Sequence, residues 1–229
     1  MWRLVWALHM LKTRHDRIAI DGFYDRVRAP TPTDLAALEK LPFDEGGWRS
    51  KHGIASFVEA DTKLGVLRRL NFEPALSIHV ISGGGTGRKS TTSIPATATV
   101  KMDFRHVPDQ RVDDTVRLLR AHLDHEGFGD IEVEPFGGSE PTRTALDDPL
   151  VLAAVRSART VYGVEPAVHP SSAGSGPMYG LCESIGIPAI SLGITHAGSN
   201  FHGPDENIRL DDFILGIKHI AAMFLEFAD

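Results

Sequence analysis

The chain has 229 residues and a formal net charge of −6, with 42% hydrophobic and 24% charged residues, which is ordinary for a globular protein. This acidic balance argues against a nucleic-acid-binding protein, which should carry a basic stripe. The single cysteine, Cys182, cannot form an internal disulfide, and no apolar run approaches the roughly 20 residues that span a bilayer. We therefore expect neither a nucleic acid nor a membrane among the partners of this chain.

Helices are expected at three places between residue 1 and about residue 135. The start, MWRLVWALHMLKTR, predicts an amphipathic helix with leucines on one face, and no small-residue cleavage site of a signal peptide follows it. Thr31-Pro32 predicts a helix start, because a cap hydroxyl precedes a proline at the first helical position. A third helix is expected over residues 109–126, with valines and leucines on one face and Gly127 at its end.

Strands alternate with these helices. Apolar and polar residues alternate over residues 76–80 and again over residues 98–105, which predicts two half-buried strands, and Ile131 with Val133 predicts a third. The run GGGTGRKS between the first two resembles a phosphate loop. However, Arg88 stands where that loop needs a glycine before its lysine. This part therefore predicts an α+β layer, with antiparallel strands covered by helices.

The pattern changes after about residue 136. Asp148-Pro149 predicts the start of a helix that ends at Gly163, and a further helix is expected over residues 177–186. The continuous apolar run 187–192 is typical of a strand buried on both faces in a parallel sheet. A closing helix is expected over residues 210–227, because four large apolar residues recur there at helical spacing: Phe213, Ile217, Ile220 and Phe224. The pattern resembles one end of a doubly wound α/β domain, although one buried strand cannot form a parallel sheet by itself.

The loop SLGITHAGSNFHGPDEN follows the expected buried strand and holds two histidines and two acids. Ligands bind at the carboxyl ends of strands in open α/β sheets, so His202 is a candidate metal ligand and His196 a loop residue near the site. The alternative is a solvated histidine, because a zinc site needs three or more protein ligands.

Two other motifs are rejected. AGSGP around Ser175 resembles a nucleophile elbow, but Ala173 and Pro177 replace its two required glycines, so a serine hydrolase is not predicted. Cys182 lies on an apolar expected helix, where a packed thiol is more common than a nucleophile.

Several longer stretches resemble the zinc-dependent aminoacylase and carboxypeptidase family, and most closely its carnosinase-like dipeptidase branch. The tail SSAGSGPMYGLCESIGIPAISLGITHAGSNFHGPDENIRLDDFILGIKHIA resembles the C-terminal end of that branch. The pieces GFYDRVRAPTP, LSIHVISGGGTGRKSTTSIPATATVKMDFRHVPDQ and FGGSEPTRTALDDPLV match it in the same order. Together these motifs cover nearly the whole chain.

The resemblance implies a mixed α/β and α+β fold in two domains. Residues 1–135 would form an antiparallel-sheet-plus-helices lid domain that lacks its first strand and mediates dimerisation. Residues 136–229 would form the C-terminal segment of a doubly wound catalytic domain. The complete enzymes of this family are implied to bind two zinc ions, to form homodimers through the lid and to be cytoplasmic.

The resemblance also assigns roles to individual residues. His202 matches the last metal ligand, and Ser175 with Gly174 matches a substrate-binding turn. Arg105 matches the lid arginine that holds the substrate carboxylate, a role that suits the two-pronged guanidinium; the alternative for Arg105 is a surface ion pair with Asp103. Thr92 matches a lid residue that contacts substrate across the dimer.

Some of the family's motifs do not occur in this chain. These are the His-x-Asp motif, the bridging aspartate, the Glu-Glu pair that supplies the general base, and the lid histidine expected just before Met1. Glu140 also occupies the position where animal carnosinase-like members carry a histidine, so no preference for histidine dipeptides is predicted. We therefore expect a truncated member of the family that is inactive alone. Its complete form would hydrolyse small peptides or N-acyl amino acids. The alternative is a non-catalytic dimerisation or binding module, or a decayed gene remnant.

Overall fold

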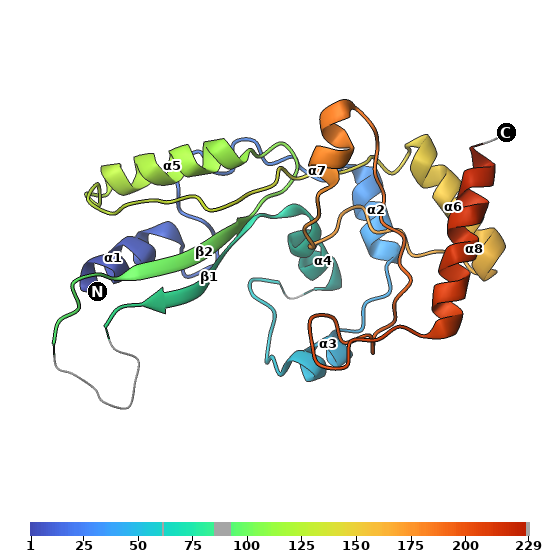
Figure 1. Cartoon of the computed structure of the whole chain (residues 1–229), viewed down its shortest axis with the longest axis horizontal. Coiled ribbons are helices and arrows are strands. Elements are labelled where there is room, and N and C mark those ends of the chain that lie inside the picture. Colours follow the sequence, from blue (N-terminus) through green and yellow to red (C-terminus); the bar gives the residue numbers. More distant parts are fainter. Residues whose placement is uncertain (61, 85–92, 228–229) are drawn as a thin grey trace. The chain divides into compact units, whose positions relative to one another are not determined.

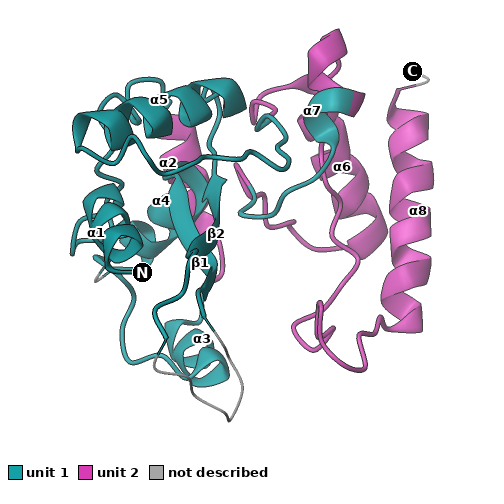
Figure 2. Cartoon of the chain, turned by 60° about the vertical axis from the view of Figure 1, so that its left-hand side comes forward, with its two compact units in different colours: residues 1–30, 43–142, 172–180 teal, residues 31–42, 143–171, 181–229 magenta. Residues whose placement is uncertain are grey.

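The computed structural model describes residues 1–60, 62–84 and 93–227, which fold into two compact units (Figure 2). Unit 1 comprises residues 1–30, 43–142 and 172–180, and unit 2 comprises residues 31–42, 143–171 and 181–229. Helices make up most of the regular secondary structure of the described residues, with one sheet of two antiparallel strands. No helix within these residues is long and apolar enough to cross a membrane.

Unit 1 is built around strands β1 (Ala75–Ser82) and β2 (Thr99–Arg105), which confirms the two alternating patterns. Their register pairs Ala75 with Arg105 and Leu76 with Phe104, and it shifts at a bulge between Ile78 and Val80. Helices α1 (Trp2–Leu11) and α5 (Val112–His125) lie beside the sheet (Figure 1). The shared core contains buried residues from these elements and from the segment that follows α1: Ala7, Leu11, Ile18, Ile20, Phe23, Leu76, Leu119 and Leu123.

The other helices of unit 1 begin at side-chain caps. The Asp44 carboxylate accepts a hydrogen bond from the Gly47 amide at the start of α3 (Glu45–His52). The Thr62 hydroxyl accepts one from the Gly65 amide at the start of α4 (Lys63–Phe72). Such caps satisfy amide groups that have no partner within the helix. Residues 172–180 complete the unit and include most of α7 (Met178–Leu181).

Unit 2 contains the helices α2 (Pro32–Lys40), α6 (Pro149–Tyr162) and α8 (Leu210–Glu226), and the short 3₁₀ helix η1 (Glu183–Ile185). The predicted starts of α2 and α6 are confirmed, with caps at Thr31 and Asp148, and α6 ends at Gly163 with a positive φ of 69°. Only glycine adopts that backbone region without strain.

Helices α6 and α8 pack side by side (Figures 1 and 2). The buried face of α6 consists of small residues, which allow α8 to approach closely. From α8, the buried His219 ring contacts the Ala154 carbonyl of α6 through Nε2 at 3.0 Å and packs edge-on against Tyr162. The buried residues of α8 are therefore Gly216 and His219, whereas the four large apolar residues that revealed the helix are 45–72% exposed.

Replacing Gly216 with alanine is expected to destabilise the chain by about 1–3 kcal/mol, although alanine is normally the better helix former. A Cβ atom there would lie 2.3 Å from Ile194 Cγ2. Urea denaturation measures the change, and Gly46→Ala in α3 is the matched control, because its nearest atom is 3.7 Å away. Ile194→Ala in the same chain should recover part of the loss. A Gly216→Ala variant as stable as the wild type would contradict this packing.

Two of the expected strands do not form, and these predictions were wrong. Ile131 packs against the core of unit 1, but the Arg120 side chain takes its carbonyl group, which a neighbouring strand would otherwise use. In the run 187–192, the Thr144 hydroxyl donates to the Ala189 carbonyl at 2.6 Å and accepts from the Ala189 amide at 3.0 Å. One side chain thus satisfies both backbone groups of Ala189, and within the described residues this apolar segment has no strand partner.

The helix expected over residues 177–186 is interrupted. It consists of α7 and η1, separated at Cys182, whose backbone angles (φ −132°, ψ −66°) are not helical. The Cys182 carbonyl accepts hydrogen bonds from the amides of Ile185 and Ile187 instead of continuing the α-helical ladder. Cys182 is only partly buried.

Candidate functional site

Two residues that the sequence assigns to substrate binding meet in unit 1. Arg105 is the last residue of β2, and its Nη1 donates a hydrogen bond to Ser175 Oγ at 2.6 Å, across 70 positions of the sequence. Both side chains are exposed, and the second terminal nitrogen of Arg105 makes no hydrogen bond with any described residue. The pair therefore forms a cationic, solvent-accessible donor site.

The loop of Ser175 is held by local and tertiary contacts. The Gly174 amide donates to Ser172 Oγ at 3.1 Å, and a Cβ at Gly174 would lie 3.3 Å from the same oxygen, so a side chain there would crowd the turn. Further along, Arg111 donates to the Tyr179 hydroxyl at 3.0 Å, and its guanidinium lies 5.7 Å from the ring centre. These contacts attach the 172–180 segment to the rest of unit 1.

Arg105 also makes the ion pair that the sequence offered as an alternative role. Its Nε lies 2.7 Å from Asp103 Oδ2, and the other carboxylate oxygen of Asp103 contacts His79 Nε2. The surface ion pair and the contact with Ser175 therefore coexist on one guanidinium. The reasoning from sequence missed His79, because nothing in the alternating pattern of β1 distinguishes it from other outward polar residues.

A second group of polar residues lies at the start of α5. The Glu140 carboxylate accepts hydrogen bonds from the Val112 amide at 3.2 and 3.3 Å, so it satisfies a free amide of that helix. Nearby, His106 Nε2 lies 2.8 Å from Thr115 Oγ1. Burial lowers the pKa of His106, against the opposing charge of Glu140, and this favours the neutral ring.

His202 lies in a loop of unit 2 that is ordered by its neighbours. The His196 Nδ1 accepts from the Gly198 amide at 3.0 Å, which in the neutral ring places the proton on Nε2, 3.1 Å from Asn207 Oδ1. The Asn207 amide group donates to the carbonyls of Gly198 and Asp205. Both nitrogens of His196 are thus engaged, whereas His202 is exposed and has a positive φ of 57°.

The described residues do not by themselves provide a complete zinc site. No group of three or more histidine, cysteine, aspartate or glutamate side chains within them is placed to hold a metal ion. His202 could donate one imidazole nitrogen, but a zinc site needs at least three protein ligands. Thr92, the expected contact across a dimer, lies outside the described residues.

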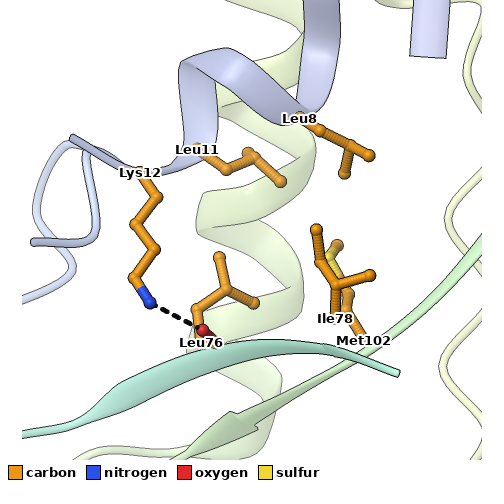
Figure 3. Close-up of a pocket in the computed structure, with 6 residues that line it drawn as sticks. All are labelled: Leu8, Leu11, Lys12, Leu76, Ile78 and Met102. Carbon is orange, nitrogen blue, oxygen red and sulfur yellow. Dashed lines mark hydrogen bonds between the residues drawn. The ribbon is translucent and has the colours of Figure 1, made fainter. Parts of the chain in front are cut away.

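Unit 1 also contains a small apolar cavity of about 180 Å³ between α1 and the sheet (Figure 3). Its polar lining residue, Lys12, donates to the Leu76 carbonyl at 3.0 Å and pairs with Asp16. The lysine is already engaged, so the cavity offers no polar group to orient a ligand. The remaining lining residues are apolar: Leu8, Leu11, Leu76, Ile78 and Met102.

Comparison with solved structures and characterised proteins finds several similar proteins, and those described below are all named as peptidases. A metallo-carboxypeptidase of the M20 family from Sulfolobus solfataricus superimposes with a TM-score of 0.90 at 33% identity, over 98% of this chain and 51% of that one. Human carnosine dipeptidase 1 gives a TM-score of 0.79 at 28% identity, over 100% and 49% of the two chains. The human Beta-Ala-His dipeptidase is 29% identical over 98% of this chain and 45% of its own length.

The chain spans about half the length of the relatives it matches. The profile of peptidase family M20/M25/M40 matches residues 42–226, which is most of the chain. Taken together with the fold similarity, this match shows that the chain belongs to peptidase family M20/M25/M40.

Proposed function

We propose that this chain is part of a metal-dependent hydrolase of the dipeptidase type, and that it supplies the site for the substrate carboxylate. Family membership and relatives named as dipeptidases and a metallo-carboxypeptidase support the reaction class. The observation that carries the proposal is the contact between Arg105 and Ser175. The substrate would be a small peptide or an N-acyl amino acid with a free carboxylate.

The chemistry of the pair suits a carboxylate. Ser175 Oγ accepts a hydrogen bond from Arg105, so its own hydrogen is free to donate to a ligand. The second terminal nitrogen of Arg105 can donate to the same ligand. A carboxylate would then accept one charge-assisted and one neutral hydrogen bond, which together fix its position and orientation. The exposure of both side chains leaves the approach open to a small substrate.

The assignment of domains and of zinc belongs to the same proposal. Residues 1–135 would be the lid and dimerisation domain, and residues 136–229 the C-terminal segment of the catalytic domain. His202 would hold one metal ion of a zinc site whose other ligands lie outside the described residues. The resemblance supports a cytoplasmic homodimer, and we propose that the 229 residues alone are inactive.

The genomic DNA upstream of the Met1 codon decides which protein to assay. If it continues in frame into the His-x-Asp and Glu-Glu motifs, the full protein with zinc is expected to hydrolyse dipeptides. His202→Ala should then lower turnover at least 100-fold, because it removes a metal ligand. His9→Ala, which replaces an exposed histidine of α1, is the matched control.

Two results would contradict this proposal. The first is a full protein that hydrolyses no dipeptide, or one whose His202→Ala variant keeps the wild-type rate. The second is an upstream region without these motifs, together with a chain that shows no turnover in added zinc. In that case a stable dimer in light scattering would favour the dimerisation or binding module instead.

A further inference from the structure

We propose that Asp103 is a positioning residue for Arg105, and that His79 in turn holds Asp103. This inference deepens the proposed carboxylate site and rests on it. The geometry is a chain of contacts on one surface of unit 1, from His79 through Asp103 and Arg105 to Ser175. Nothing in the reasoning from sequence assigned a role to His79, and Asp103 was only an alternative partner for the arginine.

The first step is which nitrogen of Arg105 contacts Asp103. Asp103 and Arg105 are two positions apart on β2, so their side chains emerge from the same face of the strand. Asp103 Oδ2 forms an ion pair with Arg105 Nε at 2.7 Å, while Nη1 of the same guanidinium donates to Ser175 Oγ. Holding Nε therefore orients the end of the guanidinium that would meet a carboxylate.

The second step is the β-bulge in β1. In the register, Ser77 pairs with Asp103 and Ile78 with Met102, but Val80 already pairs with Lys101. His79 is thus the extra residue of the bulge and has no partner in the ladder. Bulges re-aim a side chain in this way, and they recur beside functional sites. Here the bulge brings the His79 ring to the carboxylate oxygen that Arg105 does not use.

The third step compares the exposed fractions of the three side chains. The Asp103 side chain is 29% exposed, against 53% for Arg105 and 54% for His79. The carboxylate therefore lies between two more exposed groups, and it is occupied on both oxygens. A ligand carboxylate would compete with Asp103 only poorly for Nε, and it would be directed to the free terminal nitrogen.

The test uses the whole 229-residue chain and two probes, glycylglycine and glycylglycinamide, followed by NMR. The Arg105 Nε–H resonance is assigned by its loss in Arg105→Lys. In Asp103→Asn we expect exchange of this hydrogen with water to accelerate at least tenfold. The dissociation constant for glycylglycine should rise about tenfold. The dissociation constant for glycylglycinamide, which lacks the carboxylate, should stay unchanged. His79→Ala should weaken glycylglycine binding about threefold, and His79→Gln, which keeps a donor, should restore it.

Asp130→Asn is the matched control, because it breaks an exposed arginine–aspartate pair, with Arg3, in the same unit. A purely structural role for Asp103 would lower the melting temperature and affect both probes equally. The proposal is overturned if Asp103→Asn leaves both the Nε–H exchange and the glycylglycine affinity within twofold of the wild type. If the wild-type chain binds no glycylglycine, the proposed carboxylate site fails, and the Nε–H exchange alone decides whether Asp103 holds Arg105.

Discussion

Replacing Arg105 with leucine is expected to weaken the binding of glycylglycine to this chain about 30- to 150-fold. The change removes the charged donor that would meet the carboxylate, and hydrogen bonds to charged groups are worth about 1.5–3 kcal/mol. A loss of about 2–3 kcal/mol corresponds to that factor. Titration of the labelled chain with glycylglycine, followed at the amide of Ser175, measures the effect.

Arg105→Lys separates charge from geometry in this experiment. Lysine keeps the positive charge but lacks the planar guanidinium, so we expect an intermediate, about tenfold loss of affinity for glycylglycine. Arg117→Leu is the control, because Arg117 is also exposed on unit 1 and also pairs with an aspartate, Asp114. Equal binding by the wild type and Arg105→Leu would show that the carboxylate lies elsewhere. A similar loss in Arg117→Leu would show that only the net charge matters.

Replacing Asp34 with alanine is expected to lower the free energy of unfolding by about 3–5 kcal/mol, the cost of breaking a buried ion pair. The Asp34 and Arg143 side chains are 3% and 7% exposed, and Arg143 Nη2 donates to Asp34 Oδ2 at 2.6 Å. The same carboxylate accepts from the Thr31 amide and hydroxyl at 2.8 Å, which completes the capping box of α2. The substitution therefore removes the Asp34 half of the capping box and the charge partner of Arg143 together.

Urea denaturation measures this loss, and Asp44→Ala is the matched control. Asp44 is the cap of α3, but it is exposed and accepts one amide hydrogen bond, so about 1 kcal/mol is expected there. Replacing Asp34 and Arg143 together by leucine should cost less than Asp34→Ala, because no charge then remains buried. An Asp34→Ala variant no less stable than Asp44→Ala would contradict the burial of this pair.

The contribution of Asp34 to the free energy of unfolding also depends on pH. Burial raises the pKa of Asp34, but the hydrogen bonds from Thr31 and the charge and hydrogen bond of Arg143 outweigh it, so the pKa lies below its ordinary value of 3.8. A lowered pKa stabilises the fold fully above pH 3.8 and progressively less as the pH falls through the folded value. The difference between the wild type and Asp34→Asn should therefore shrink below pH 3.8.

The starts of α2 and α6 could be predicted from the sequence because they depend on neighbouring residues. Thr31 caps α2 and Asp148 caps α6, and each acts within three positions of its own helix. Strands were harder, because a strand exists only if another segment takes its backbone groups. At Ala189 that partner is the Thr144 side chain, 45 positions away, and an apolar run cannot reveal such a choice.

The candidate site divides in the same way. Resemblance named Arg105 and Ser175 separately, but only the fold brings a residue at the end of β2 to a loop 70 positions later. His79 could have been found only from the bulge in β1, which depends on the register with β2. The spacing of Phe213, Ile217, Ile220 and Phe224 predicted α8, yet Gly216 and His219 face α6.

The sequence by itself therefore determined the helices α1, α2, α5, α6 and α8, the strands β1 and β2, and the family, because these depend on local hydrogen bonding, residue spacing and the order of motifs. Tertiary structure decided which face of α8 packs, which apolar runs remain without strand partners, and which polar side chains meet Arg105. Those outcomes depend on contacts between distant segments. Their free energies are set by close packing and by buried hydrogen bonds, and neither has a signature in residue spacing.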